Sequence, residues 1–224
     1  MMKSKVYSIF AASILLLGSC ASGKFKTNGT DPSAISELSI LEPVSFIHGI
    51  NKGNQSELSD SLSFYSQVLW VDVIKQNQYR LPKISKLNID DAHESSIIAQ
   101  QTVEFLDMLA VSKNIQDIPV PPMVIAALDA EQSRFGLLSA HSGFTRRKGN
   151  YTGQILKSIG IGVLTMGMYY PVPSKSNSTL FIAIVDNQTS QPIFFKSSTL
   201  MDKEPLDPKV LNKQLDKLFK GYFW

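Results

Sequence analysis

The only cysteine in this 224-residue chain, Cys20, has the most informative position and chemistry. It follows two small residues, Gly18-Ser19, at the end of an apolar run over residues 6–17. A basic start, an apolar run of about a dozen residues and small residues beside a cleavage point are the parts of a secretion signal. The run is shorter than the roughly 18 apolar residues that a bilayer span requires. We therefore interpret residues 1–19 as a removed signal peptide and Cys20 as the first residue of the mature chain.

The sequence Leu17-Gly18-Ser19-Cys20 resembles the lipobox of bacterial lipoproteins. This resemblance implies that the thiol of Cys20 receives a diacylglyceryl group and that cleavage leaves the acylated cysteine at the N-terminus. Since burial of acyl chains contributes about 0.8 kcal/mol per CH₂, several chains on one residue would hold the protein on a membrane permanently. Because Ala21-Ser22 contains no aspartate, the resemblance implies an outer-membrane location, and we expect the body to face the periplasm. The alternative is a secreted protein with a chance cysteine at the cleavage site.

Histidine and serine side chains are the remaining candidates for catalysis. The chain has three histidines, His48, His93 and His141. The pair His141-Ser142 suggests a base and a nucleophile, but neighbours on a strand point to opposite faces, and Ser142 lacks the G-x-S-x-G context of a nucleophile elbow. The sequence contains no H-E-x-x-H, paired C-x-x-C, phosphate-loop or dinucleotide-binding pattern. We therefore expect no catalytic residue, no metal and no cofactor.

Two short segments are predicted to contact a partner. Arg146, Arg147 and Lys148 form the densest basic cluster and fall in a predicted loop, where the alternative explanation is a solvated turn. Tyr222-Phe223-Trp224 ends the chain with three aromatic residues, and large exposed apolar patches usually have a partner. Packing of these aromatics back onto the protein's own sheet is the alternative.

Composition restricts the class of protein. The formal net charge of +3 falls by two when Lys3 and Lys5 leave with the signal peptide, and a near-neutral chain is not typical of a nucleic-acid binder. A chain with no second cysteine forms no internal disulfide. The length fits one domain, so we predict a single α/β domain over residues 41–224, preceded by a flexible, lipidated tether over residues 20–40.

The hydrophobic pattern predicts a mixed sheet with antiparallel C-terminal strands, helices packed on it and an amphipathic C-terminal helix. Strands are expected at residues 43–50, 79–85 (an edge strand), 134–145, 159–170, 178–186 and 191–197. Helices are expected at residues 54–75, 91–112 and 122–132, and from 207 onward. The stripe predicted to face the core is Leu58, Leu62, Tyr65, Leu69 and Val73 in the first helix, and Val210, Leu211, Leu215, Leu218 and Phe219 in the last.

The body resembles an α/β domain shared by curli-secretion channel lipoproteins, lipoprotein activators of penicillin-binding proteins and the N-terminal domain of the periplasmic protein TolB. Residues 133–140 and 180–195 carry this resemblance. It implies a role in an envelope assembly. A channel subunit is disfavoured because membrane-spanning β-strands need roughly 9–11 residues each, and the breaks at 146–151 and 171–177 are too short to hold hairpins.

These observations favour a non-enzymatic, membrane-anchored periplasmic lipoprotein that scaffolds or regulates an envelope assembly by contacting another envelope protein. Two alternatives stay open. One is a periplasmic serine hydrolase that uses Ser142, and the other is a lipoprotein that binds a small ligand or glycan with Tyr169, Tyr170 and nearby aromatics.

Overall fold

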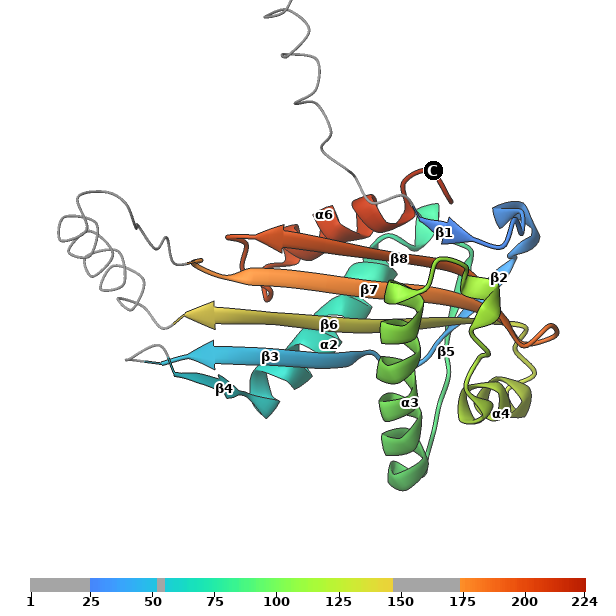
Figure 1. Ribbon diagram of the computed structural model, residues 1–224, viewed down its shortest axis with the longest axis horizontal. Coiled ribbons are helices and arrows are strands. Elements are labelled where there is room, and N and C mark those ends of the chain that lie inside the picture. Colours follow the sequence, from blue (N-terminus) through green and yellow to red (C-terminus); the bar gives the residue numbers. More distant parts are fainter. Residues whose placement is uncertain (1–24, 52–54, 147–173) are drawn as a thin grey trace, which may run out of the picture.

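The computed structural model describes residues 25–51, 55–146 and 174–224, which form a mixed α/β structure built on one sheet. This confirms the predicted fold class. Figure 1 shows the sheet with helices on both sides. The strands of the described residues are β1 (Lys26–Thr27), β2 (Glu37–Ile40), β3 (Val44–Ile50), β4 (Ser56–Leu58), β5 (Lys83–Lys86), β6 (Phe135–Arg146), β7 (Asn177–Asp186) and β8 (Gln191–Met201).

The sheet has β6 at its centre. One side of β6 pairs with the antiparallel series β7 and β8, and β1 adds two residues to the edge of β8. The other side of β6 pairs in parallel with β2 at its start and with β3 along the rest of its length. β5 extends the sheet beyond β2, and β4 extends it beyond β3. The predicted antiparallel arrangement of the C-terminal strands β6, β7 and β8 is therefore confirmed within the described residues.

The helices begin where the sequence supplies a cap. The side chains of Ser59, Asp91 and Asp207 accept hydrogen bonds from backbone N–H groups in the first turns of α2 (Asp60–Gln76), α3 (Ala92–Val111) and α6 (Pro208–Phe219). Proline occupies the first turn of α4 (Pro122–Ala130), where its missing N–H costs nothing. Short 3₁₀ turns lie at Pro32–Ala34, Gln78–Arg80 and Ile115–Asp117.

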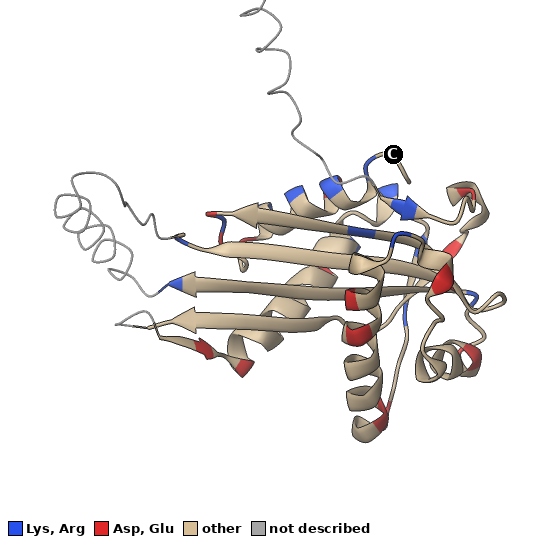
Figure 2. Ribbon diagram, viewed as in Figure 1, with Lys and Arg blue, Asp and Glu red and all other residues tan. Residues whose placement is uncertain are grey.

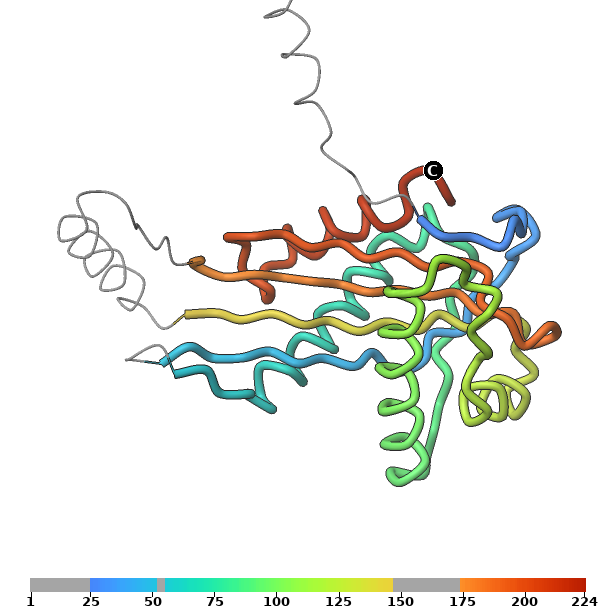
Figure 3. The backbone as a smooth tube through the Cα atoms, in the orientation of Figure 1, coloured from blue at the N-terminus to red at the C-terminus, as the bar shows by residue number. Residues whose placement is uncertain are grey.

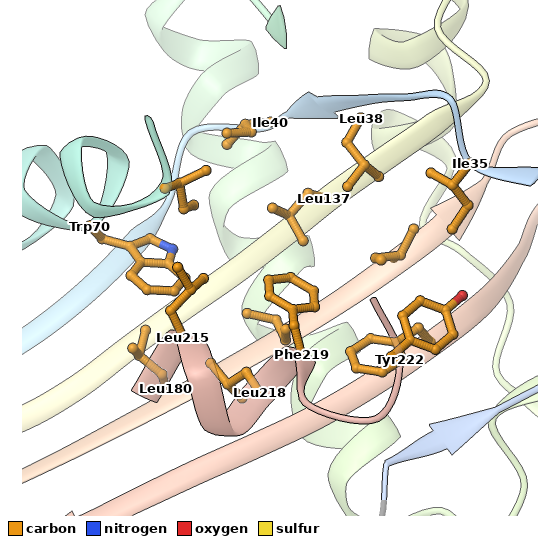
Figure 4. Packing of buried hydrophobic residues seen from close by; sticks show 14 of the residues in the cluster. Ile35, Leu38, Ile40, Trp70, Leu137, Leu180, Leu215, Leu218, Phe219 and Tyr222 are labelled. Atoms are coloured by element: carbon orange, nitrogen blue, oxygen red, sulfur yellow. The ribbon is translucent and has the colours of Figure 1, made fainter. Parts of the chain in front are cut away.

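Two hydrophobic clusters divide the core between the sides of the sheet. We call the side packed against α2 and α6 the rear face and the side packed against α3 and α4 the front face. The rear cluster includes Trp70 from α2 and Leu215 and Phe219 from α6, packed on Leu137 and Leu180 of the sheet (Figure 4). The front cluster joins Phe105 of α3 and Leu128 of α4 to the sheet residues Leu138, Ala140, Ala183, Val185 and Phe195.

Several element boundaries correct the expectations from sequence. Residues 26–27 and 37–40, which the prediction assigned to a flexible tether, belong to the sheet, and residues 20–24 of that tether lie outside the described residues. The first helix begins at Asp60 rather than at residue 54, since Ser56–Leu58 form β4. The edge strand lies at Lys83–Lys86, after Pro82 rather than through it. β8 continues to Met201, beyond the predicted end at residue 197. The strand expected at 159–170 lies outside the described residues.

Candidate functional site

Within the described residues, helices cover one end of the front face of the sheet and leave its other end uncovered. α3 and α4 pack on the half that contains Leu138 and Ala140 of β6. Along the same strand, successive residues on the same side are Ser142 and Phe144, and both are partly exposed. Figure 1 shows α3 crossing the sheet while the far ends of β3, β6, β7 and β8 carry no helix on that side. The described residues therefore leave one flat region of the sheet accessible.

We call this region the open face. Its residues stand opposite one another in the strand register: Phe46 pairs with Ser142, Ser142 with Thr179, and Thr179 with Thr199. The hydroxyl oxygens of Thr179 and Thr199 lie 3.1 Å apart across β7 and β8. The set is Phe46 and His48 of β3, Ser142 and Phe144 of β6, Asn177, Thr179 and Phe181 of β7, and Ser197, Thr199 and Met201 of β8.

The chemistry of the open face is apolar and hydroxylic rather than charged. Phe46 is 39% exposed and Met201 is 55% exposed. The set contains no Lys, Arg, Asp or Glu, although Arg146 follows Ser142 and Phe144 on the same side of β6. Figure 2 shows most of β3, β6 and β7 in tan. Aromatic rings between small hydroxyl side chains give contact area with little conformational entropy to lose, which suits binding to another surface.

The rear side of the same strands holds a chain of buried polar side chains. His141 of β6 is 1% exposed and lies between two serines. Its Nδ1 lies 2.6 Å from the hydroxyl of Ser66 in α2, and its Nε2 lies 2.9 Å from the hydroxyl of Ser178 in β7. The chain continues to Ser45 in β3 at 3.2 Å from Ser66, and to Gln214 in α6 at 2.7 Å from Ser178. Five elements, β3, α2, β6, β7 and α6, are thereby connected beneath the open face.

The amide of Gln214 fixes the direction of these hydrogen bonds. Its Nε2 donates to the carbonyl oxygens of Ser178 and Ser198, so its Oε1 accepts the hydroxyl proton of Ser178. The Ser178 oxygen must then accept from Nε2–H of His141, which leaves Nδ1 to accept from Ser66. Acceptance of the Ser66 hydroxyl proton requires an unprotonated Nδ1, and therefore a neutral imidazole. Burial lowers the pKa of His141 to about 4, which agrees with that requirement.

The structure separates His141 from Ser142. His141 points to the rear face and is buried, whereas Ser142 lies on the open face. Ser66, which does contact the ring, is fully buried. A substrate therefore has no access to a paired serine and imidazole at this position.

The predicted basic cluster is described only in part. Arg146 ends β6, donates from Nε to the carbonyl oxygen of Ser174 at 2.8 Å, and places its guanidinium 5.6 Å from the ring of Phe144. Arg146 therefore borders the open face. Arg147 and Lys148 lie outside the described residues.

The C-terminal aromatics pack against the body. Tyr222 is 8% exposed, and Phe223 and Trp224 are partly buried against the rear cluster. The guanidinium of Arg80 lies 4.0 Å from the Trp224 ring. Burial raises the pKa of Tyr222 to about 12, and the nearby carboxylate of Asp31 adds to this shift. These residues have a structural role in the described protein, and a contact with a partner stays a prediction.

Other predicted site residues lie outside the described parts of the chain, namely Cys20, Tyr169 and Tyr170. Among the described residues, no three His, Cys, Asp or Glu side chains are placed to bind one metal ion. In the same residues, no helix is both long enough and apolar enough for a bilayer crossing.

Sequence reasoning did not identify the open face. A usable signal was present, because alternate residues of a strand share one face. Phe46 and His48 share a face of one strand, and Ser142 and Phe144 share a face of another, and none of the four is an aliphatic core residue. The assignment also needs the register of four strands, which no single segment reveals.

The chain resembles several solved structures at low identity. It matches no protein-family model and no curated protein. A PelC dodecamer structure from Paraburkholderia phytofirmans is 7% identical, with a TM-score of 0.40 over 88% of this chain and 98% of that one. The LpoB C-terminal domain from Salmonella enterica is 10% identical, with a TM-score of 0.32 over 78% and 87%. The Chlamydia trachomatis protein CT253 is 9% identical, with a TM-score of 0.36 over 84% and 97%.

Proposed function

We propose that this protein is a non-enzymatic lipoprotein of the bacterial cell envelope, anchored through acylated Cys20 in the outer membrane, that binds a partner protein in the periplasm through the open face. The observation that supports this most directly is the abrupt end of helix cover on the front face, which leaves Phe46 and Met201 exposed beside a row of hydroxyl side chains. Exposed apolar groups gathered on one flat surface are typical of an interaction site.

The composition of the open face defines the partner surface. Arg146, at the edge of the open face, is its one charged neighbour on β6, and the central part of the face carries no Lys, Arg, Asp or Glu. A charged partner group buried on this central part would find no salt bridge and would lose its hydration at a net cost. The partner therefore presents an uncharged surface with apolar groups that pack against Phe46, Phe144 and Phe181. Its polar groups can hydrogen-bond to Ser142, Thr179 and Thr199.

A non-enzymatic role agrees with the placement of the one buried imidazole. Both ring nitrogens of His141 are used by serines within the protein, and the ring is buried. A general base must reach the proton that it removes from a substrate or nucleophile. If a serine-directed covalent probe labelled Ser142 in the folded protein, a hydrolase would replace the present proposal.

Site-specific photo-crosslinking in intact cells tests the partner contact. A photoreactive amino acid replaces Phe46 on the open face, and a matched chain carries it at Phe64, an exposed aromatic on the outer side of α2 (65% exposed). We expect one defined adduct from position 46 that is absent from position 64. Adducts of equal yield from both positions, or none from position 46, would refute binding at the open face.

Mass measurement of the mature chain tests the anchor separately. We expect an acyl-modified N-terminal residue in the unaltered protein, and loss of both the added mass and membrane retention in a Cys20→Ser variant. An unmodified mature chain would remove the lipoprotein assignment, whatever the result of crosslinking.

A further inference from the structure

The N-terminal end of the described body is fixed beside the end of α6. The ring of Phe25 lies 5.8 Å from that of Tyr222, which follows α6, and 5.7 Å from that of Phe194 in β8. Lys26 donates from Nζ to the carbonyl oxygens of Leu109, Ala110 and Ser112 at the C-terminal end of α3. Figure 3 shows the first described residues and the C-terminus close together. The chain therefore joins the body at one defined place.

The connection from this place to Cys20 is short. Four residues lie between Cys20 and Phe25, and even a fully extended chain covers about 18 Å over the five Cα-to-Cα steps that join them. A tether over residues 20–40 would let the body stand well away from a membrane, but residues 26–27 and 37–40 belong to the sheet. If Cys20 lies in the lipid surface, the C-terminal end of α6 must lie near that surface as well.

The outer side of α6 carries a row of lysines. Lys209, Lys213, Lys217 and Lys220 are all exposed. At about 100° of rotation per residue they occupy an arc of about 80°. The opposite side of the helix packs into the rear cluster through Leu211, Leu215, Leu218 and Phe219. Figure 2 shows the basic positions of α6 on the side of the molecule where β1 begins.

Acidic side chains of the protein itself neutralise little of the positive charge of this lysine row. The one acidic residue between Lys209 and Lys220 is Asp216, whose carboxylate lies 2.7 Å from the guanidinium of Arg80. α3 has the opposite character, because it carries Glu94, Glu104 and Asp107 and no Lys or Arg. Charge is thus separated between two helices, although the chain as a whole is close to neutral.

We propose that the lysine row of α6 (Lys209, Lys213, Lys217 and Lys220) binds the anionic phospholipid headgroups of the membrane that holds Cys20. This inference rests on the proposed lipid anchor, which brings α6 within reach of the headgroups. Lysine ammonium groups attract anionic lipids within roughly one Debye length, about 8 Å at physiological salt. The apolar side of α6 is already used by the core, so the helix lies on the headgroups without inserting.

Lysine footprinting of the full lipidated protein in nanodiscs tests this contact. The protein is purified from membranes and placed in discs of phosphatidylcholine alone or of phosphatidylcholine with phosphatidylglycerol, and a water-soluble acetylating reagent is applied. We expect acetylation of the four α6 lysines to slow by about threefold or more in the anionic discs, and to recover in 0.5 M salt. Lys83 and Lys86 of β5, at the opposite end of the sheet order, are the internal controls and should be unchanged.

A charge-reversed pair provides the matched test. In Lys213→Glu/Lys217→Glu, the protection of Lys209 and Lys220 should disappear, whereas Lys83→Glu/Lys86→Glu should leave it intact. Equal acetylation in both kinds of disc, with the protein retained in the discs, would overturn the lipid contact and leave the anchor standing. Failure of the protein to remain in the discs would overturn the anchor and, with it, this inference.

Discussion

The front face of the sheet has two halves that the same strands build from different residues. In the covered half, β6 and β7 present Leu138, Ala140 and Ala183, whose exposed fractions do not exceed 8%. A few residues further along, the same faces of the same strands present Ser142, Phe144 and Thr179. Backbone geometry is shared, so the difference lies in side chains and in the position of α3.

This contrast shows which side chains allow part of a sheet surface to stay exposed to solvent. Aliphatic residues in the covered half must be buried, because each would expose apolar area at a cost of about 25 cal/mol per Å². Hydroxyl side chains in the open half are satisfied by water and by each other, as Thr179 and Thr199 show. The aromatic rings between them keep enough apolar area for a partner to bury. The covered half thus stabilises the fold, and the open half is available for binding.

Truncation of Leu138 should give the largest effect on this comparison. The side chain is fully buried in the front cluster, so Leu138→Ala should lower the free energy of unfolding by about 3–5 kcal/mol through lost burial and a cavity. Phe46→Ala in the open half should cost less than about 1 kcal/mol, because its ring is already partly exposed. Chemical denaturation measures both. Equal losses would mean that the open half carries core stability and is not a free surface.

Low pH should lower the free energy of unfolding through the buried side chain of His141, which lies behind the open half. The pKa of His141 is about 4 in the folded protein and about 6.5 in an unfolded chain. The neutral ring contributes its full stability above pH 6.5, and about 3 kcal/mol is lost as the pH falls from 6.5 to 4, because the unfolded chain binds the proton first. The groups that face the ring are the uncharged hydroxyls of Ser66 and Ser178.

The measurement is a pair of denaturation series over this pH range. His141→Gln removes the titrating ring, so the difference in unfolding free energy between the two proteins should shrink as the pH falls. Proton titration of His141 followed by NMR gives the folded pKa directly. A constant difference between pH 7 and 4.5 would contradict a buried neutral imidazole.

The sequence predicted elements well where every core-facing residue is apolar. The stripe expected for α6 is buried at all five of its positions. The stripe expected for α2 is confirmed at Val73, which is buried, and at Leu69, which packs against the rear cluster. It is wrong at Leu58, which lies in β4, and at Tyr65, which is 51% exposed, and it lacks Ser63 and Ser66, which face the core. Periodic hydrophobicity cannot identify a helix side that buries serines. The hydrogen bonds of those serines to β3 and β6 are made by residues 16 and 75 positions away.

Two further features depended on contacts that local sequence does not show. Residues 37–40 resemble the end of a polar tether, but they pair in parallel with β5 and β6, which lie far along the chain. The prediction ended β8 at residue 197, because the short hydroxyl side chains that follow look like loop residues. The exposed residues at this end of β8 include Ser197 and Thr199. In the sheet they alternate with the buried Ser198 and Leu200, which is the pattern of a strand with one solvated face.

Glycine at position 143 gives a smaller and more local test of the rear support. A Cβ atom there would lie 2.5 Å from the carbonyl oxygen of Asn177 and 2.9 Å from Cβ of Pro205, and a backbone oxygen cannot yield without shifting β7. We expect Gly143→Ala to destabilise the protein by about 1–3 kcal/mol. Gly49→Ala in β3 is the matched control, because a Cβ there meets no atom within 4 Å. If both variants melt alike, the rear of the open half is more loosely packed than its structure indicates.

A single positive charge on the open face should have the smallest effect of these changes on the free energy of unfolding and the largest effect on binding of the partner. Thr199 is exposed, so Thr199→Lys should alter the free energy of unfolding by less than about 1 kcal/mol, even though its hydroxyl contact with Thr179 is lost. A partner surface without a matching carboxylate would have to bury an unpaired ammonium group, and the adduct formed from position 46 should disappear.

Gln76→Lys at the exposed end of α2 adds the same charge away from the open face and should leave that adduct unchanged. Persistence of the adduct in Thr199→Lys would place the contact nearer α3. Loss of the adduct in both variants would instead show that the net charge of the protein is the cause. Gln76→Lys adds the same charge without changing the open face, so a true docking surface should be sensitive to Thr199→Lys alone.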